Sequence, residues 1–392
     1  MSAAIVSTHA NPVDQDKLAS ANTGFAFKLL TAIAKEQPEK NIFISPYSVS
    51  TVLQMVENGA SGKTKAELRQ ALGIPALSQS AQNEANRVLS RVINAGTTNF
   101  VLNTANAIWY RSSIPVKPAF IACNQDFYQA TVEALNFNDP ATVGHINSWV
   151  NEKTHGKIPG MLSGPIDPMT SLYLANAVYF KGDWLNPFKV EDTKDGDFHL
   201  RGGKSKKLPM MFQGGNFSYR KGTGYQAVRL PYQGWNLGMY VFLPDADSSP
   251  EKLLAIMNGD NWRRVTVPGF KDREGTLALP RFKFEYGVDL KKPLQALGIQ
   301  KAFLAKSADF SSMCSEPVFI SEASQKAFVE VNEKGTEAAA VTMVEAMALG
   351  IEMNPPKPFQ MIVDRPFLFV IEHGESKTIL FMGVVFDPSL AE

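Results

Sequence analysis

The pattern of apolar positions predicts helices in the first part of the chain. An apolar face with helical spacing begins at Asn22, after a polar stretch that we expect to form a loose tail over residues 1–20. Ser45 and Pro46 suit a helix start, because serine caps an N-terminus and proline fits the first helical position. Gly73 suits a helix end. Further helices are expected at 66–72, 84–93 and 145–154.

Strands are expected mainly in the second half, where β-branched and aromatic runs are bounded by turn residues. The sequence ends in a clear hairpin, with a turn at His373–Ser376 between two arms that are apolar on both faces and therefore buried on both sides. No internal repeat or low-complexity linker divides the chain, so we expect one mixed α/β (α+β) domain over residues 21–389. The expected strands are 41–44, 101–110, 171–180, 225–230, 238–243, 275–284, 366–372 and 377–386.

The composition is that of a globular protein that does not need a framework of disulfide bonds. The chain has 392 residues, of which 44% are hydrophobic, and a net charge of +1, so neither nucleic acid nor a membrane surface is expected as a partner. No apolar run approaches the roughly 18 residues of a membrane span. Cys123 and Cys314 are too few for a disulfide framework or a cysteine-rich zinc site. Two free thiols are favoured, and a single bridge between them remains open.

The N-terminus gives little information on the compartment. A short apolar run at residues 3–6 lacks a basic leader and does not have the pattern of a signal peptide. The protein is therefore expected to be cytoplasmic, or secreted or periplasmic if a signal peptide has been removed.

No pattern typical of an enzyme emerges. The five histidines do not form metal-binding spacings, and no Gly-x-Ser-x-Gly nucleophile motif occurs. Residues 58–64 superficially resemble a phosphate loop, but the first glycine would have to stand where Glu57 is. We expect no catalytic residue, no metal and no cofactor.

The sequence of one segment near the C-terminus is compatible with two secondary structures. Residues 336–346 contain good helix formers, and composition alone favours a surface helix followed by a loop. Read at period two, however, the segment has one face of small, uncharged residues and one face that carries both carboxylates, as in a half-buried strand. The first face is Thr336, Ala338, Ala340, Thr342, Val344 and Ala346; the second is Glu337, Ala339, Val341, Met343 and Glu345.

A resemblance to a known family favours the strand over the helix. Residues 329–340, Val-Glu-Val-Asn-Glu-Lys-Gly-Thr-Glu-Ala-Ala-Ala, resemble the hinge of the reactive-centre loop of serpins. Other stretches resemble further family segments, in family order, and together they cover about residues 21–389. They are 41–48, 103–109, 147–158, 174–184, 279–282, 366–369 and 381–388.

The resemblance implies a fold and a mechanism. The serpin fold has three β-sheets, eight or nine helices and an exposed reactive-centre loop, here at about 333–358. A target serine protease attacks this loop, forms a covalent acyl complex, and is trapped when the loop inserts as a new strand in the large sheet. We expect a monomer that acts as an irreversible suicide-substrate inhibitor; a cross-class inhibitor of papain-like cysteine proteases and a non-inhibitory serpin are the alternatives. The hinge residues are Glu333, Gly335, Thr336, Glu337, Ala338, Ala339 and Ala340.

The resemblance also implies control positions in the large sheet. Ser45, Ser48, Asn176 and Gln325 match a polar cluster (the shutter) beneath the sheet centre. Gln325 stands where the family usually has histidine, and since glutamine does not titrate, we expect little pH dependence of sheet opening near neutrality. Trp184 matches a family tryptophan at the end of the large sheet where the loop enters. At the same end, Glu333 is expected to form an ion pair with Arg281.

The family spacing, counted from Gly335, places the reactive bond at Leu349–Gly350. A count from the C-terminal side would instead place it near Glu352–Met353. Leucine suits proteases with an apolar primary pocket, of the chymotrypsin, elastase or cathepsin G kind. No lysine or arginine occurs between residues 336 and 356, which disfavours trypsin-like targets, and no basic helix suggests a heparin-type cofactor.

Overall fold

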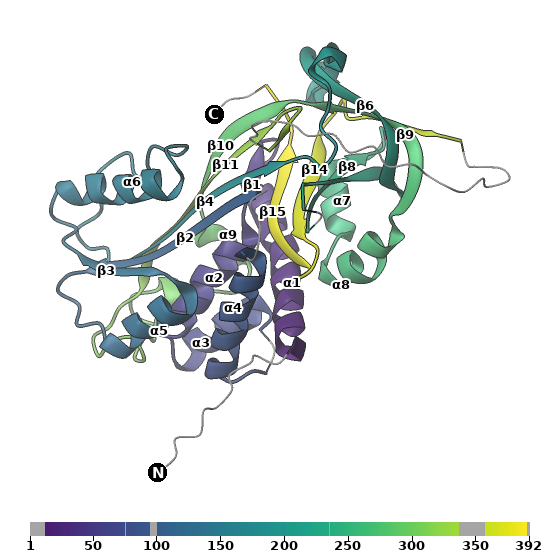
Figure 1. Cartoon of the computed structure of the whole chain (residues 1–392). Coiled ribbons are helices and arrows are strands. Elements are labelled where there is room, and N and C mark those ends of the chain that lie inside the picture. The colour runs from purple at the N-terminus through teal and green to yellow at the C-terminus, as the bar shows by residue number, and fades with distance from the viewer. Residues whose placement is uncertain (1–11, 75, 95–99, 235, 337–356, 390–392) are drawn as a thin grey trace.

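The computed structural model describes residues 12–74, 76–94, 100–234, 236–336 and 357–389, whose strands form two hydrogen-bonded sheets packed against helices (Figure 1). The nine-stranded sheet has the order β1-β15-β14-β8-β7-β6-β9-β13, with β5 paired to β6. The six-stranded sheet has the order β10-β11-β12-β4-β2-β3. This confirms the mixed α/β class that the sequence predicts.

The strands are β1 Ile42–Ile44, β2 Phe100–Arg111, β3 Thr131–Leu135, β4 Leu172–Asp183, β5 Lys194–His199, β6 Ser205–Gly222, β7 Tyr225–Pro231, β8 Leu237–Pro244, β9 Lys271–Pro280, β10 Phe282–Asp289, β11 Ile320–Val331, β12 Gly335–Thr336, β13 Phe359–Ile362, β14 Phe367–His373 and β15 Thr378–Val385. The α-helices are α1 Pro12–Glu36, α2 Pro46–Glu57, α3 Gly62–Leu72, α4 Gln79–Asn94, α5 Pro118–Tyr128, α6 Ala141–Lys153, α7 Pro250–Ile256, α8 Gly259–Asn261 and α9 Lys291–Ala296. None of the described helices is long and apolar enough to span a membrane.

Strand β6 explains why two sheets are counted where three were expected. It is 18 residues long, pairs with β9 over residues 210–219, and pairs with β7 through its last five residues. One continuous strand therefore joins two parts of the larger sheet. Conversely, the single strand expected at 275–284 is divided into β9 and β10 at Arg281.

The N-terminal boundary differs from the prediction. Helix α1 begins at Pro12, so residues 12–20 are helical and not part of a loose tail. Leu18 and Ala19 are buried, and Asp16 accepts a hydrogen bond from Arg263. Most residues before Leu18 are polar and lie on the exposed side of the helix, which hid the helical pattern in the sequence.

Helix ends follow the predicted chemistry. The Ser45 side chain caps α2 by accepting a hydrogen bond of 3.3 Å from the Ser48 amide, with Pro46 at the first position. Helix α3 ends at Gly73, whose φ of 65° is left-handed and therefore favours glycine. Both predictions are confirmed.

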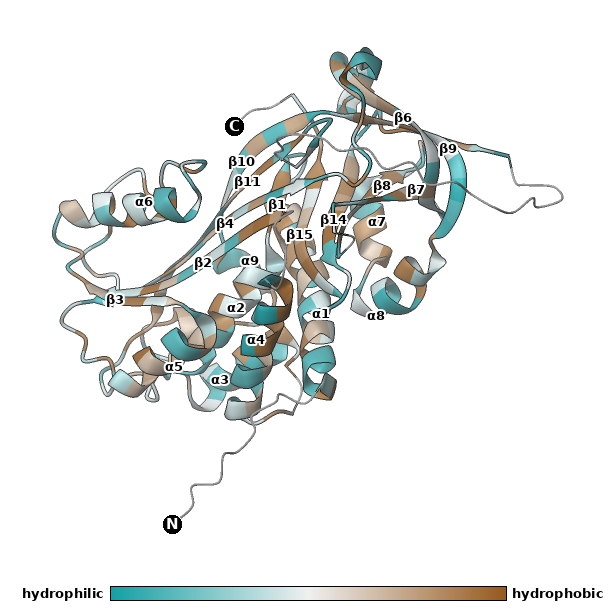
Figure 2. Ribbon diagram, in the orientation of Figure 1, coloured by the Kyte–Doolittle hydropathy of each residue, from teal (hydrophilic) through white to brown (hydrophobic). Residues whose placement is uncertain are grey.

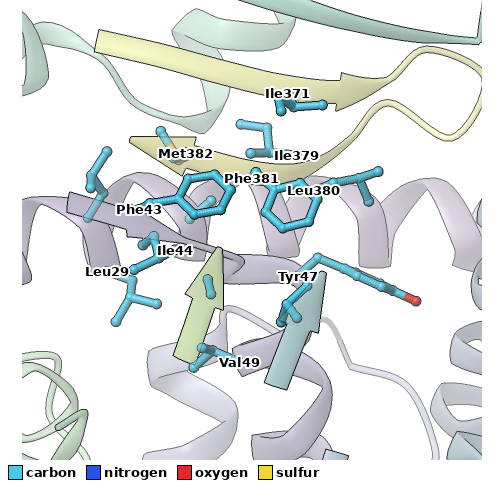
Figure 3. Close-up of a cluster of buried hydrophobic side chains, with 14 of the residues drawn as sticks. Leu29, Phe43, Ile44, Tyr47, Val49, Ile371, Ile379, Leu380, Phe381 and Met382 are labelled. Carbon is cyan, nitrogen blue, oxygen red and sulfur yellow. The ribbon is translucent and has the colours of Figure 1, made fainter. Parts of the chain in front are cut away.

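The core brings the C-terminal hairpin against the first helices and strand. In Figure 3, side chains of β14 and β15 face β1, α1 and α2, and Phe43 stacks on Phe381 with ring centroids 5.2 Å apart. Both hairpin strands are buried on both faces, as predicted, and they are among the most hydrophobic ribbons in Figure 2. This packing places the N-terminus of α2 directly under the six-stranded sheet.

Candidate functional site

The six-stranded sheet is parted at one end. Strands β4 and β11 are parallel neighbours, paired from Leu172–Tyr179 to Ile320–Phe328. Beyond these residues β12 lies between them, antiparallel to both, with Thr336 opposite Gly182 on one side and Val331 on the other. A parallel pair of strands thus already accommodates the first residues of an antiparallel strand.

The turn that leads into β12 is fixed by neighbouring backbone and by Trp184. The Trp184 indole donates to the Asn332 carbonyl at 3.0 Å, and its amide donates to the Lys334 carbonyl at 2.8 Å. The Trp184 ring stacks on Tyr232 at 4.5 Å. Trp184 therefore lies at the end of the sheet where the sequence places it, beside the point where β12 enters.

Gly335 and Thr336 are in close contact with β4. A Cβ on Gly335 would lie 2.2 Å from the Gly182 carbonyl oxygen, so no larger residue fits without a backbone shift. Thr336 is fully buried, and its hydroxyl lies 2.7 Å from that of Tyr232. Thr336 therefore points inward, as the period-two pattern requires.

Glu333 and Arg281 form the expected ion pair. The Arg281 Nε donates to the Glu333 carboxylate at 2.6 Å, and Thr193 Oγ1 donates to the same oxygen at 2.5 Å. Burial alone would raise the pKa of Glu333, but the hydrogen bonds from Arg281 and Thr193 outweigh burial and lower this pKa. The Glu333 side chain is only 6% exposed, whereas that of Arg281 is 41% exposed, so solvent partly screens this ion pair.

A buried polar cluster lies at the middle of the same sheet. Asn176 of β4 stands in register with Gln325 of β11, and Gln325 donates a hydrogen bond to the Asn176 side-chain oxygen. Gln325 also accepts from the Ser45 amide at 3.0 Å and donates to the Ser45 carbonyl at 3.1 Å. Asn176 donates to Ser48. The structure therefore brings together all four residues that were expected to form the shutter.

Asn106 is a fifth member that was missed. It lies opposite Asn176 on β2, and its side-chain oxygen accepts hydrogen bonds from Asn176 at 2.6 Å and from Ser48 at 3.2 Å. An asparagine in the middle of an otherwise strand-forming run was the available signal, since asparagine is disfavoured in strands.

Several predicted residues lie outside the described part of the chain. They are Glu337, Ala338, Ala339 and Ala340 of the hinge, together with the reactive bond Leu349–Gly350. The two cysteines are described, and both thiols are free. Across the described residues, no group of three or more histidine, cysteine, aspartate or glutamate side chains could hold a metal ion.

Asn176→Ala is predicted to destabilise the native protein. The change removes one hydrogen bond from each of its buried partners on β2, β11 and α2, and each hydrogen bond contributes roughly 0.5–1.5 kcal/mol net. Thermal unfolding should show a clearly lower melting temperature. Gln360→Ala, which removes an exposed amide on β13, is the matched control and should change stability by less than about 0.5 kcal/mol. Equal melting temperatures for the two variants would contradict the cluster's structural role.

Glu333→Gln tests the ion pair through pH. Because the pKa of Glu333 is lowered in the folded protein, the carboxylate stabilises the fold above its ordinary pKa of 4.5, and this contribution is lost as the pH falls through the folded value. The variant should melt below the wild type at pH 6–7, and the difference should shrink below pH 4.5. A difference that stays constant from pH 3 to pH 7 would show that the charge contributes nothing.

Comparison with known proteins places this geometry in a family. The model of the family "Serpin (serine protease inhibitor)" matches residues 20–388. The leukocyte elastase inhibitor of Sus scrofa is 37% identical over 386 residues, covering 95% of this chain and 100% of the relative. Glia-derived nexin of Rattus norvegicus is 34% identical over 394 residues, covering 96% and 94%.

Solved structures agree with this assignment. The native state of the thermophilic serpin tengpin superposes with a TM-score of 0.86 at 29% identity, covering 95% of this chain and 94% of that one. Native protease nexin-1 with heparin gives a TM-score of 0.84 at 30% identity, covering 96% and 100%. The chain is homologous to inhibitory serpins, whose partners are proteases, and it is not an enzyme. It belongs to the serpin family.

Proposed function

We propose that this serpin is an irreversible suicide-substrate inhibitor of serine proteases that have an apolar primary pocket. The observation that carries the proposal is strand β12, which stands antiparallel between the parallel strands β4 and β11. The chain that continues from Thr336 can extend this strand only by separating β4 from β11. The fold therefore has a place for the loop after cleavage.

The proposed reaction begins as ordinary proteolysis. The protease serine attacks the carbonyl carbon of Leu349, an acyl ester forms, and the peptide bond to Gly350 breaks so that Gly350 becomes a new amino terminus. The freed segment after Thr336 then inserts between β4 and β11 while Leu349 remains esterified. The protease is carried along and its active site distorted before water can hydrolyse the ester. The partner is thus held in a covalent acyl complex with one serpin monomer.

The register of β12 predicts the inserted strand. Thr336 pairs with Gly182 and Val331, so each further residue moves one position back along both neighbours. Thr342 would then lie between Asn176 and Gln325, and Ala346 would lie opposite Leu172, the first residue of β4. The segment from Thr336 to Ala346 therefore has the same length as the part of β4 that runs from Gly182 back to Leu172.

The exchange of hydrogen bonds favours insertion. The β4–β11 ladder is lost, but the new strand gains a ladder on each side, and each backbone hydrogen bond contributes about 0.5–1.5 kcal/mol net. Insertion must break the hydrogen bond from Gln325 to Asn176. The Thr342 hydroxyl can both donate and accept, so it can satisfy the two amides that it separates.

Side-chain size supports inhibition over a non-inhibitory role. The residues that share Thr336's inward face are small and uncharged, and burial of a charge there would cost several kcal/mol. Relatives named leukocyte elastase inhibitor fit an apolar target pocket. A papain-like cysteine protease is the alternative target, because the same trap would act on a thioester.

Two adjacent substitutions test insertion directly. Thr342→Arg places a charge on the inward face, whereas Met343→Arg places it on the outward face of the same strand. Chymotrypsin should cleave both variants, but only Met343→Arg should retain a denaturant-resistant complex on a gel. If both variants, or neither, form the complex, the proposed register is wrong.

A protease panel tests the target class. Chymotrypsin, elastase, trypsin and papain are each mixed with the wild type, and mass spectrometry of the released C-terminal peptide identifies the bond. We expect covalent complexes with chymotrypsin or elastase and a peptide that begins at Gly350. A complex with papain alone would favour the alternative class, and cleavage without any complex would make the protein a substrate.

The pH dependence of insertion tests the shutter. None of its five described side chains titrates near neutrality, so the rate of loop insertion should vary little between pH 6 and 7.5. A steep change there would contradict this prediction. His155, whose ring lies 5.6 Å from that of Tyr179 on β4, is the neighbouring histidine to replace by glutamine in that case.

A further inference from the structure

A cavity lies beside the shutter, along the outer edge of the six-stranded sheet. Strand β3 pairs with β2 only over residues 107–111, so within the described part of the chain no strand pairs with residues 102–106 on the outer side of β2. The cavity follows this uncovered stretch and has a volume of about 690 Å³. Its other walls come from α4, from the end of α5 and from α6, which flank β2 in Figure 1. A space of this size can hold a small organic molecule.

Asn106 of the shutter presents an unused hydrogen-bond donor to this cavity. Its side-chain oxygen accepts hydrogen bonds from Asn176 and Ser48, whereas its side-chain nitrogen donates to no described residue. Asn106 is only 7% exposed, and it lines the cavity. A buried amide donor without a partner is unfavourable. The inner wall of the cavity therefore offers a donor that a bound molecule can use.

The charged side chains of the lining favour an anion. Among the described residues, Glu152 is the only carboxylate of the lining, and Lys153 Nζ lies 3.3 Å from its oxygen. Arg91 of α4 is exposed and makes no hydrogen bond or ion pair with a described residue. Its guanidinium is therefore free to bind a ligand, and arginine binds carboxylates through two parallel hydrogen bonds.

The remaining walls include two aromatic rings whose polar atoms are already engaged. The Trp149 indole donates to Thr131 at 3.1 Å, and the Tyr128 hydroxyl donates to Asn83 at 2.7 Å. These rings and the buried Leu102 therefore offer mainly apolar contact. A ligand that matches the whole lining has an aromatic body and a carboxylate.

We propose that this cavity is a binding site for a small aromatic carboxylic acid in its ionised form. Arg91 and the Asn106 amide donate hydrogen bonds to the carboxylate, and the aromatic body packs against Trp149. The site is separate from the reactive loop and from the place between β4 and β11 where the loop inserts.

A ligand at this site opposes the opening of the sheet. A strand added between β4 and β11 takes about 4.8 Å of sheet width, so β2 moves relative to β11. Gln325 keeps β11 bonded to Ser45 at the start of α2. On α4, Gln82 and Asn86 donate to Gln54 of α2. Strand β2 therefore also moves relative to α4, and the cavity between them changes shape.

The consequence for the native state is thermodynamic. A ligand that fits the cavity of the closed sheet stabilises that state by mass action, in proportion to its occupancy. This coupling rests on the proposed function, whereas the binding site itself does not.

Isothermal titration calorimetry of the intact protein tests the site with benzoate, with neutral benzamide and with inorganic phosphate. Benzoate should bind at least about tenfold more tightly than benzamide, because benzamide cannot form a charge-assisted hydrogen bond with the guanidinium. It should also bind more tightly than phosphate, which lacks an apolar body. Arg91→Gln should weaken benzoate binding at least about tenfold, since it removes the positive partner.

Two further variants separate the site from general effects of charge. Arg264→Gln removes an exposed arginine on η3 (Trp262–Thr266), which follows α8 on the other side of the molecule in Figure 1. It should bind benzoate as the wild type does. Asn106→Asp keeps an acceptor oxygen for the shutter but places a negative charge at the cavity wall, so it should bind no benzoate. If Asn106→Asp does not fold, the comparison of Arg91→Gln with Arg264→Gln still decides.

Each outcome of the titrations decides a stated property of the site. Equal affinity of Arg91→Gln and the wild type, or no heat with benzoate, overturns the binding site. Equal affinity for benzoate and benzamide makes the cavity an apolar pocket and overturns recognition of the carboxylate. Tighter binding of phosphate than of benzoate overturns the aromatic class of ligand.

Saturating benzoate tests the coupling to the sheet. It should raise the melting temperature of the wild type. With the best protease of the panel, it should also lower the fraction of cleavage events that end in a covalent complex, because slower insertion gives water more time to hydrolyse the acyl ester. Arg91→Gln should show neither effect, which excludes an action of benzoate on the protease.

The same experiment distinguishes failure of the coupling from failure of the proposed function. Benzoate that binds the wild type but leaves the trapped fraction unchanged overturns the coupling. If the wild type is cleaved but never trapped, the proposed function is wrong, while calorimetry still decides the binding site.

Discussion

The parallel pairing of β4 and β11 is the constraint on which the rest of the structure depends. Parallel neighbours are separated in sequence and need no turn between them, so a strand can enter between them without a chain crossing. Strand β12 follows β11 through a short turn and is therefore antiparallel to both neighbours. Because β12 is antiparallel to β4 and β11, a continuation of β12 can enter the sheet only as an antiparallel strand between these two.

Two groups of polar side chains stabilise the pairing of β4 with β11, one at the end of the strands next to β12 and one at the centre of the sheet. At the end next to β12, the turn around Glu333 is fixed by Arg281, Thr193 and Trp184. At the centre, the buried amides of Asn106, Asn176 and Gln325 cross three strands in register and bind the start of α2. Because buried amides are costly to leave unpaired, the sheet resists opening until another polar group can replace each bond. A threonine at the matching position of the loop would supply that group.

Much of this could be predicted from sequence because it depends on local patterns. Ser45–Pro46 and Gly73 mark helix ends through backbone chemistry, and the apolar hairpin identifies a doubly buried strand pair. The family motifs supplied Ser48, Asn176, Gln325, Trp184 and the Arg281–Glu333 pair, which are far apart in the sequence. Asn106 was missed because its role depends on register with Asn176, and register between strands 70 residues apart is not visible in either strand alone. The helical start at Pro12 was missed because few of its first residues are apolar.

We expect the native sheet to be less stable than the sheet with the loop inserted, and one measurement tests this most directly. The protein is cut once in the segment between Thr336 and Lys357, and the melting temperatures of intact and cut protein are compared. Insertion adds a ladder on each side of a new central strand, so the cut protein should melt far above the intact one. A cut protein that melts at the same temperature, or lower, would contradict the account, because the freed segment would then have no place between β4 and β11.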